Sequence, residues 1–369
     1  MSIAVSPLEV FRAKGVPHRR MEDWKYSDLR SAIDEKSVEH ISGACIRTDA
    51  PAPIESLGAG DVMPEWLANR IESLGRVGSM EAAARAFAGG VLALRVPAGE
   101  QVDLPLHIDY MSAGHSHIVL SVEARASLTL LETYRARGGG LQNTSLSIFL
   151  EEGARLTHIR QASFASELIA VETVSVVQAK DSRYRVHLME GGAKLSRVEF
   201  NIALKGEGAE ADLSGISVLG DHAHADITTH IDHAVPNTIS RQLFKKVAGD
   251  YSRAIYQGKI TVREGAVGSD SRQTAKALLL SARAEADLKP ELEILADDVK
   301  CAHGAAIGDL DADSLFYLRS RGIADDEAHT LLINAFLQEV VDHIEDDAVR
   351  SSAVEFVEAG LARAMIVAP

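Results

Sequence analysis

The middle of the chain, from Val91 to about Leu310, consists of short strand-like stretches joined by turns of small residues. Stretches such as SLTLLETY, LSIFLEE, YRVHLME and GKITVRE follow the strand period of two, with apolar and polar residues in alternation. Glycine and alanine dominate the joints, as in EEGARL, EGGAKL and REGAVG, and prolines are rare. Because helical periodicity is absent throughout this stretch, the core must be built from strands.

The spacing of the joints favours a repetitive arrangement of these strands. Gly153 and Gly192 are 39 positions apart, and so are Gly265 and Gly304. Two coils of about 19–20 residues would fit each interval, as in a solenoid whose coils bury their apolar faces on one another. We therefore predict a mainly β fold with a parallel β-helix core. A β-sandwich, which also uses short strands and glycine turns, is the alternative.

The segments on both sides of this core have helical patterns. Residues 7–45 and 61–90 are predicted to be helical and are joined by the Pro- and Gly-rich connector TDAPAPIESLGAG. Helical patterns return after Gly304. The prediction is an N-terminal helical region at 1–90, a β-helix core at 91–310 and a C-terminal helical region at 311–369.

One C-terminal helix, IADDEAHTLLINAFLQEVVDHI, is apolar on more than one face. The first apolar face consists of Ala328, Leu331, Leu332, Ala335, Phe336 and Val340, and the second of Ile333, Leu337, Val341 and Ile344. A helix that covers a single core needs only one such face. The second face suggests contact with a partner, although a buried helical cap would give the same pattern.

Charge and missing motifs exclude several functional classes. A formal net charge of −15 disfavours nucleic acid and anionic membrane surfaces, since both attract clustered Lys and Arg. The two cysteines, Cys45 and Cys301, form no disulfide framework, and neither a signal-peptide core nor an apolar run of membrane-helix length is present. No G-x-x-x-x-G-K-[ST] phosphate loop occurs, so no directly bound nucleotide is expected. These features predict a cytoplasmic protein.

Two pairs of residues have the side chains of metal ligands. Cys301 and His303 in KCAHG are two positions apart, so both side chains leave the same face of a strand. Thiolate and imidazole suit iron, zinc or an iron–sulfur cluster, but two ligands cannot complete a tetrahedral site. His222 and His224 in DHAHADITTHIDHAVP have the same spacing and could bind zinc or iron. The alternative for either pair is a structural role in the core or in a turn.

The sequence from Asp226 to Ile344 resembles the SufB/SufD family of iron–sulfur cluster assembly proteins. KCAHGAAIG and LFYLRSRGI are the most specific motifs of this resemblance. The opening GVPHRRMEDWKYSDLR is similar to the start of the SufD branch, and segments expected of SufB are missing. Between about residues 31 and 215, only the strand-like texture supports the resemblance.

The resemblance implies a right-handed parallel β-helix between helical terminal regions. It implies a non-catalytic scaffold subunit that pairs with SufB through the end of its β-helix and binds the ABC-type ATPase SufC through its C-terminal helices. His303 would be a ligand of a nascent, transient iron–sulfur cluster at the SufB interface, with Cys301 beside it and further ligands on the partner chain. The same surface could accept a second copy of the chain, giving a homodimer.

Two other functions stay open on the sequence. A self-contained metal-binding β-helix protein would use His222 and His224 with the histidines that follow them. A β-helix carbohydrate-active enzyme would use clustered carboxylates on one face and is usually secreted. The missing signal peptide and the lack of an obvious acidic pair argue against this enzyme.

Overall fold

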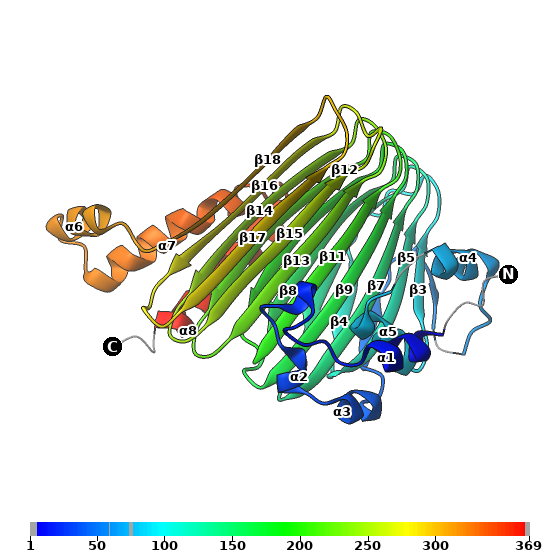
Figure 1. Cartoon of the computed structure of the whole chain (residues 1–369), viewed down its shortest axis with the longest axis horizontal. Helices are drawn as coiled ribbons and strands as arrows, with labels where there is room; N and C mark the ends of the chain where they lie inside the picture. Colours follow the sequence, from blue (N-terminus) through cyan, green and yellow to red (C-terminus); the bar gives the residue numbers. More distant parts are fainter. Residues whose placement is uncertain (1–5, 59, 74–76, 366–369) are drawn as a thin grey trace.

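Two β-sheets wound together as a solenoid form the body of the protein, and helices lie at both ends of the chain (Figure 1). The computed structural model describes residues 6–58, 60–73 and 77–365. The outermost residues of the two predicted helical regions, 1–5 and 366–369, lie outside this part. The predicted parallel β-helix with helical flanks is confirmed, and the sandwich alternative is wrong.

We call the two sheets the even sheet and the odd sheet, because all strands except β1 and β2 lie in the sheet that matches their even or odd number. In spatial order, the even sheet contains β1 (Ile46–Asp49), β4 (Leu106–Tyr110), β6 (Ser127–Tyr134), β8 (Arg155–Ser163), β10 (Arg183–Gly191), β12 (Glu210–Leu219), β14 (Ile239–Ala248), β16 (Asp270–Leu279) and β18 (Lys300–Gly308). The odd sheet contains β17 (Glu285–Ile294), β15 (Arg253–Val262), β13 (His224–His233), β11 (Leu195–Leu204), β9 (Leu168–Gln178), β7 (Gly140–Leu150), β5 (Gly114–Val122), β3 (Leu92–Val96) and β2 (Glu55–Leu57). Only the pairings of β1 with β4 and of β2 with β3 are antiparallel in these sheets, as far as the described residues extend.

Each turn of the solenoid is longer than the glycine spacing predicted. Arg155 pairs with Arg183, and Arg183 pairs with Glu210, so the turns take 28 and 27 residues by difference of residue number. The predicted coil of about 19–20 residues is wrong, because each turn from β5 onward contributes one strand of 8 to 11 residues to each sheet. Gly153 precedes an even strand and Gly192 precedes an odd strand, so their separation measures one and a half turns.

Alternate residues of each strand face the interior and form the main core. On β10, Tyr184, Val186 and Leu188 are buried, whereas Arg183 is exposed and Arg185 is half-buried. Because neighbouring strands are parallel and in register, inward residues of successive turns stack in columns along the solenoid. Any residue on a later even strand can therefore be assigned to a column from its register partner.

The interior also contains charged side chains that the sequence analysis did not identify. The Glu132 carboxylate lies 2.5 Å from His158 Nε2 and accepts a hydrogen bond of 2.5 Å from the Tyr110 hydroxyl. Arg160 forms an ion pair with Glu172. These five side chains are almost completely buried. Since an unpaired buried charge is strongly destabilising, the pairs are mutually dependent parts of the core.

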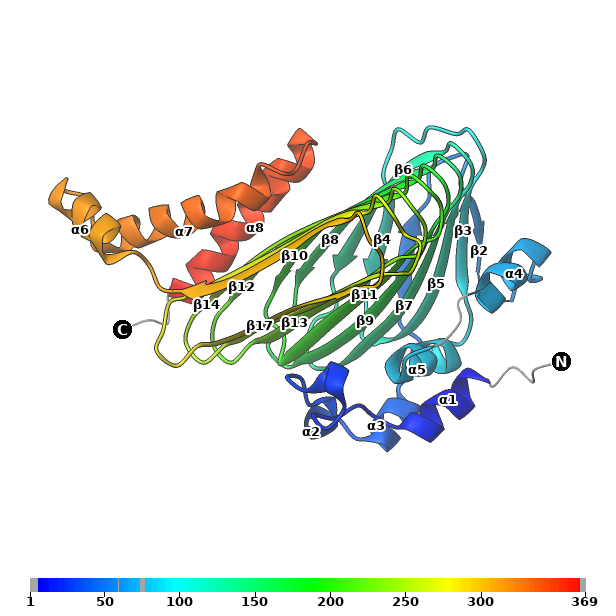
Figure 2. The same ribbon diagram turned by 45° about the horizontal axis from the view of Figure 1, so that its top comes forward.

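The N-terminal region packs on the outer face of the odd sheet (Figure 2). Its helices are short: α1 (Pro7–Lys14), the 3₁₀ helix η1 (Glu22–Trp24), α2 (Leu29–Ala32), α3 (Glu35–His40), α4 (Glu65–Ser73) and α5 (Ser79–Phe87). The centre of the Trp24 ring lies 4.3 Å from the guanidinium carbon of Arg197 on β11, and this contact anchors the segment to the sheet.

Of the C-terminal helices, the last two pack on the outer face of the even sheet (Figure 2). The C-terminal helices are α6 (Ala312–Ser320), α7 (Asp325–Val341) and α8 (Asp347–Met365). Ile333, Leu337 and Val341 of α7 are buried in one cluster with Ile216 and Val247 of the sheet. This second apolar face of α7 is therefore used within the chain. Figures 1 and 2 show α6 projecting away from the solenoid.

Candidate functional site

Strand β18 carries Cys301 and His303 on the last turn of the solenoid. Cys301 pairs with Ser271 of β16, and His303 pairs with Gln273. Ser271 and Gln273 are buried, so Cys301 and His303 continue two inward columns. Cys301 is half-buried against the main core, while His303 is exposed.

The last turn is uncovered within the described part of the chain. β18 has its neighbour β16 on one side and is the end strand of the even sheet, just as β17 is the end strand of the odd sheet. Ile307 on β18 and Ile294 on β17 are 48% and 42% exposed, although their register partners in the preceding turn, Ala277 and Val262, are buried. An end strand with unpaired backbone groups and exposed apolar side chains is suited to pairing with another chain.

The chemistry of Cys301 and His303 is that of an incomplete ligand set. Partial burial raises the pKa of the Cys301 thiol above its usual value, so a metal ion would have to displace a proton to bind the thiolate. No group of three or more His, Cys, Asp or Glu side chains able to hold a metal ion occurs among the described residues. Further ligands would therefore have to come from outside the described chain.

A ladder of hydroxyl groups lies behind Cys301. Ser271 Oγ is 2.7 Å from Ser240 Oγ, and Ser240 Oγ is 2.9 Å from His233 Nε2. His233 is fully buried, and burial lowers its pKa to about 4. The imidazole is therefore neutral at physiological pH and exchanges hydrogen bonds with hydroxyl groups on both of its nitrogens.

Amide and phenol groups lie behind His303. Gln273 Nε2 donates a hydrogen bond of 2.7 Å to the Tyr256 hydroxyl, which donates one of 3.1 Å to Gln242 Oε1. Gln242 also accepts a hydrogen bond of 2.7 Å from Thr229. These polar residues were not identified from the sequence. The pattern of β16 could have indicated them, because Ser271 and Gln273 face the interior and alternate with exposed or half-exposed residues.

The structure places His222 and His224 apart from Cys301 and His303. His222 lies in the turn before β13 and stacks on Tyr251 with 4.8 Å between the ring centres. His224 begins β13, in the odd sheet, and its Nε2 is 2.8 Å from Ser27 Oγ. Because Ser27 donates its hydroxyl hydrogen to Asp226, it accepts from the His224 N–H. His224 Nε2 is therefore hydrogen-bonded to the N-terminal segment.

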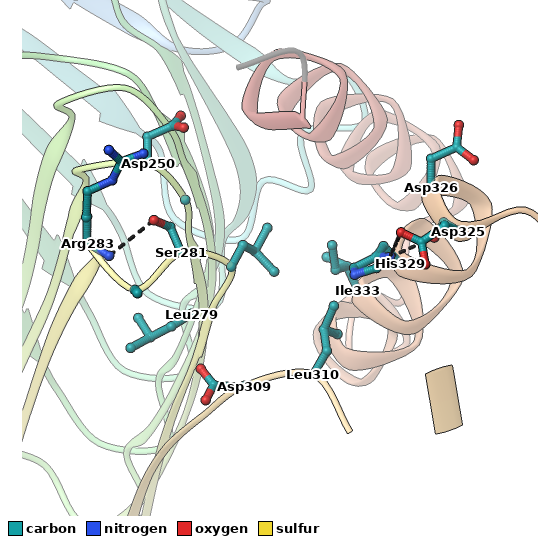
Figure 3. Close-up of a pocket in the computed structure, with 13 residues that line it drawn as sticks. Asp250, Leu279, Ser281, Arg283, Asp309, Leu310, Asp325, Asp326, His329 and Ile333 are labelled. Carbon is teal, nitrogen blue, oxygen red and sulfur yellow. Dashed lines mark hydrogen bonds and ion pairs between the residues drawn. The ribbon is translucent and has the colours of Figure 1, made fainter. Parts of the chain in front are cut away.

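A second surface of interest is formed by the C-terminal helices. Phe316 and Tyr317 of α6 are 74% and 56% exposed, and Leu331 of α7 is 45% exposed. A cavity of about 690 Å³ separates the start of α7 from the turns of the solenoid. Figure 3 shows Asp325 on the helix side of this cavity and Arg283 on the solenoid side. The first part of the C-terminal region thus offers aromatic side chains and an acidic helix start to the surroundings.

Comparison with known families and proteins places this geometry in context. The chain matches the family model described as "SUF system FeS cluster assembly, SufBD core domain" over residues 108–336, which includes β18 and most of α7. None of the helices in the described ranges is both long and apolar enough to cross a membrane.

Similar proteins occur in several bacteria. An iron–sulfur cluster assembly SufBD family protein of Synechocystis is 32% identical over 68% of this chain. The match spans 59% of the length of that relative. The iron–sulfur cluster assembly protein SufD of Escherichia coli is 27% identical, over 92% of this chain and 88% of the relative. A SufBD family protein of Mycobacterium leprae is 27% identical over 93% and 90% of the two chains.

Proposed function

Because the chain belongs to the SufBD family of the SUF iron–sulfur cluster assembly system, we propose that it is a non-catalytic, SufD-type scaffold subunit. Its role is to supply ligands for a nascent iron–sulfur cluster. The observation that carries this proposal is the position of Cys301 and His303 on the inward columns of an uncovered last turn. A partner that covers this turn would bring its own ligands beside them, which resolves the incomplete ligand set.

The partner at this end is a SufB-like chain whose own solenoid has an open last turn. Stacking the two ends extends both sheets across the interface and buries the exposed Ile294 and Ile307. The cluster is the cargo of the assembly and is bound transiently between the two chains, in the cytoplasm. Because the end is apolar and has unpaired strands, it can also accept a second copy of this chain when the partner is absent.

The second partner is the ABC-type ATPase, which docks on the C-terminal helices. Two exposed aromatic side chains on α6, Phe316 and Tyr317, are the anchors expected of such an interface. The second apolar face of α7 is occupied by the even sheet, so it does not bind the ATPase. Nucleotide binding and hydrolysis belong to this partner.

Co-expression with a SufB-like chain and the ABC-type ATPase tests both contacts. Ile307→Asp places a charge at the open end and should release the SufB-like chain. Phe316→Ser should release the ATPase alone. Val267→Asp is the matched control, because Val267 is 45% exposed in the turn before β16 and lies in neither surface. Retention of both partners by both variants, with folding unchanged, would contradict the assignment of these surfaces.

A further inference from the structure

We propose that Gln273 is a positioning residue for His303: its side-chain carbonyl accepts the ring N–H of His303 and leaves the other ring nitrogen free for iron. The inference rests on the proposed ligand role of His303. Gln273 lies on β16, directly opposite His303 in the register of β16 and β18. Adjacent strands are about 4.8 Å apart, so the long glutamine side chain can reach the imidazole.

The hydrogen bonds of Gln273 determine which end of its amide faces His303. The Tyr256 hydroxyl has a single hydrogen, which it donates to Gln242 Oε1, so it can only accept from Gln273. Gln273 therefore presents Nε2 to Tyr256, at 2.7 Å. Its Oε1 atom is buried and has no hydrogen-bond partner. A buried carbonyl without a donor is destabilising, and the imidazole on the next strand is a suitable donor.

Gly258 on β15 provides the space that this arrangement needs. A Cβ atom at Gly258 would lie 1.7 Å from Gln273 Nε2 and 2.5 Å from the Tyr256 hydroxyl. Any larger residue would displace the Gln273 amide from its position across the interior. The glycine is not required by its backbone conformation, since its φ is not positive. Its effect is to leave room for the Gln273 amide beside the Tyr256 hydroxyl.

A fixed imidazole is a better metal ligand than a freely rotating one. A metal-bound histidine uses one ring nitrogen, and a hydrogen bond from the other nitrogen sets the tautomer and the ring orientation. Loss of such a partner weakens metal binding by about 10- to 100-fold. His303 is exposed in the single chain, so without an acceptor its ring would sample several orientations. The carbonyl of Gln273 supplies this acceptor from within the same chain.

The test is the tautomer ratio of His303 in the full chain, measured by nitrogen-15 NMR in mildly alkaline buffer. His303→Ala identifies the resonance by difference. Replacing Gln273 with Met keeps the volume and removes the amide, which should change the tautomer ratio about fivefold, corresponding to about 1 kcal/mol. Gly258→Ala should act in the same direction. Gln178→Met is the matched control, because Gln178 is another buried glutamine with an unpaired Oε1, on β9 far from the last turn.

An unchanged tautomer ratio in Gln273→Met would overturn the proposal. If that variant does not fold, Gln273→Asn, whose shorter amide cannot span the gap, takes its place with the same expectation. Iron binding by the full complex should fall about tenfold in the Gln273 variant. If His303→Ala leaves cluster formation intact, the proposed ligand role fails, but the tautomer ratio still decides whether Gln273 contacts His303.

Discussion

Mild acid should destabilise this protein through its buried histidines, and His233 allows the effect to be isolated. His233 is fully buried, with Nδ1 2.7 Å from Thr238 Oγ1 and Nε2 2.9 Å from Ser240 Oγ. Burial lowers its pKa to about 4, with Arg241 acting in the same direction and Asp232 opposing it. The folded protein therefore disfavours the protonated imidazole.

The size and the pH range of the effect follow from this shift. The unfolded chain protonates His233 near its ordinary pKa of about 6.5, whereas the folded chain does so only near 4. A shift of about 2.5 units, at about 1.36 kcal/mol per unit, corresponds to about 3 kcal/mol. Because the unfolded state binds the proton first, stability is complete above about pH 6.5. It falls as the pH decreases and the loss is complete below about pH 4.

Urea unfolding of the wild type and His233→Gln across this pH range measures the effect. Glutamine can still hydrogen-bond to both hydroxyl groups but does not titrate. The free-energy difference between the two proteins should therefore change by about 3 kcal/mol between neutral pH and about pH 4. His40→Gln, at an exposed histidine, should follow the wild type. Parallel pH profiles for the wild type and His233→Gln would refute the argument.

Two further predictions concern the interior of the solenoid. Glu172→Gln removes the partner of the buried Arg160 guanidinium and should lower the free energy of unfolding by about 3–5 kcal/mol. In the control Glu210→Gln, the exposed pair with Arg183 should contribute less than about 1 kcal/mol, so equal losses for the two variants in urea unfolding would contradict the burial argument. Gly215→Ala places a Cβ atom 2.6 Å from the ring of Phe244 and should destabilise by about 1–3 kcal/mol through overpacking. A melting temperature at or above that of the wild type would show that the ring moves aside freely.

The alternation of apolar and polar residues predicted a core built from strands, and burial alternates in this way along strands such as β6. The same alternation fits a β-sandwich, so it did not by itself predict the solenoid. The length of a turn was not predictable from the glycines. Gly153 follows β7 of the odd sheet and Gly192 follows β10 of the even sheet, so the two glycines lie on opposite sides of the solenoid and are not equivalent positions. The buried charges were missed for a related reason: Glu132 and Arg160 occupy inward positions, and only the three-dimensional register shows that their partners lie opposite.

The two-residue spacing correctly predicted that two candidate ligands share a face only where the chain forms a strand. Cys301 and His303 lie on β18, so their shared face is real. His222 lies in a turn, so the strand period does not determine the direction of its side chain, although both histidines line one pocket. β18 is the last strand of the even sheet and is uncovered. This position depends on the number of turns in the solenoid, which cannot be predicted from the pattern of one short stretch of sequence. The ligand roles themselves stay predictions.

The measurement that tests the central claim most directly is cluster formation by the full complex with His303→Ala. His303 is exposed on the last turn, so its truncation leaves no cavity in the core and should preserve folding and assembly with the SufB-like chain and the ATPase. After anaerobic reconstitution with iron and sulfide, the account predicts a strong loss of cluster absorbance relative to the wild type, and a similar or smaller loss for Cys301→Ala. Undiminished cluster absorbance in an intact His303→Ala complex would contradict the ligand role on which the proposed function rests.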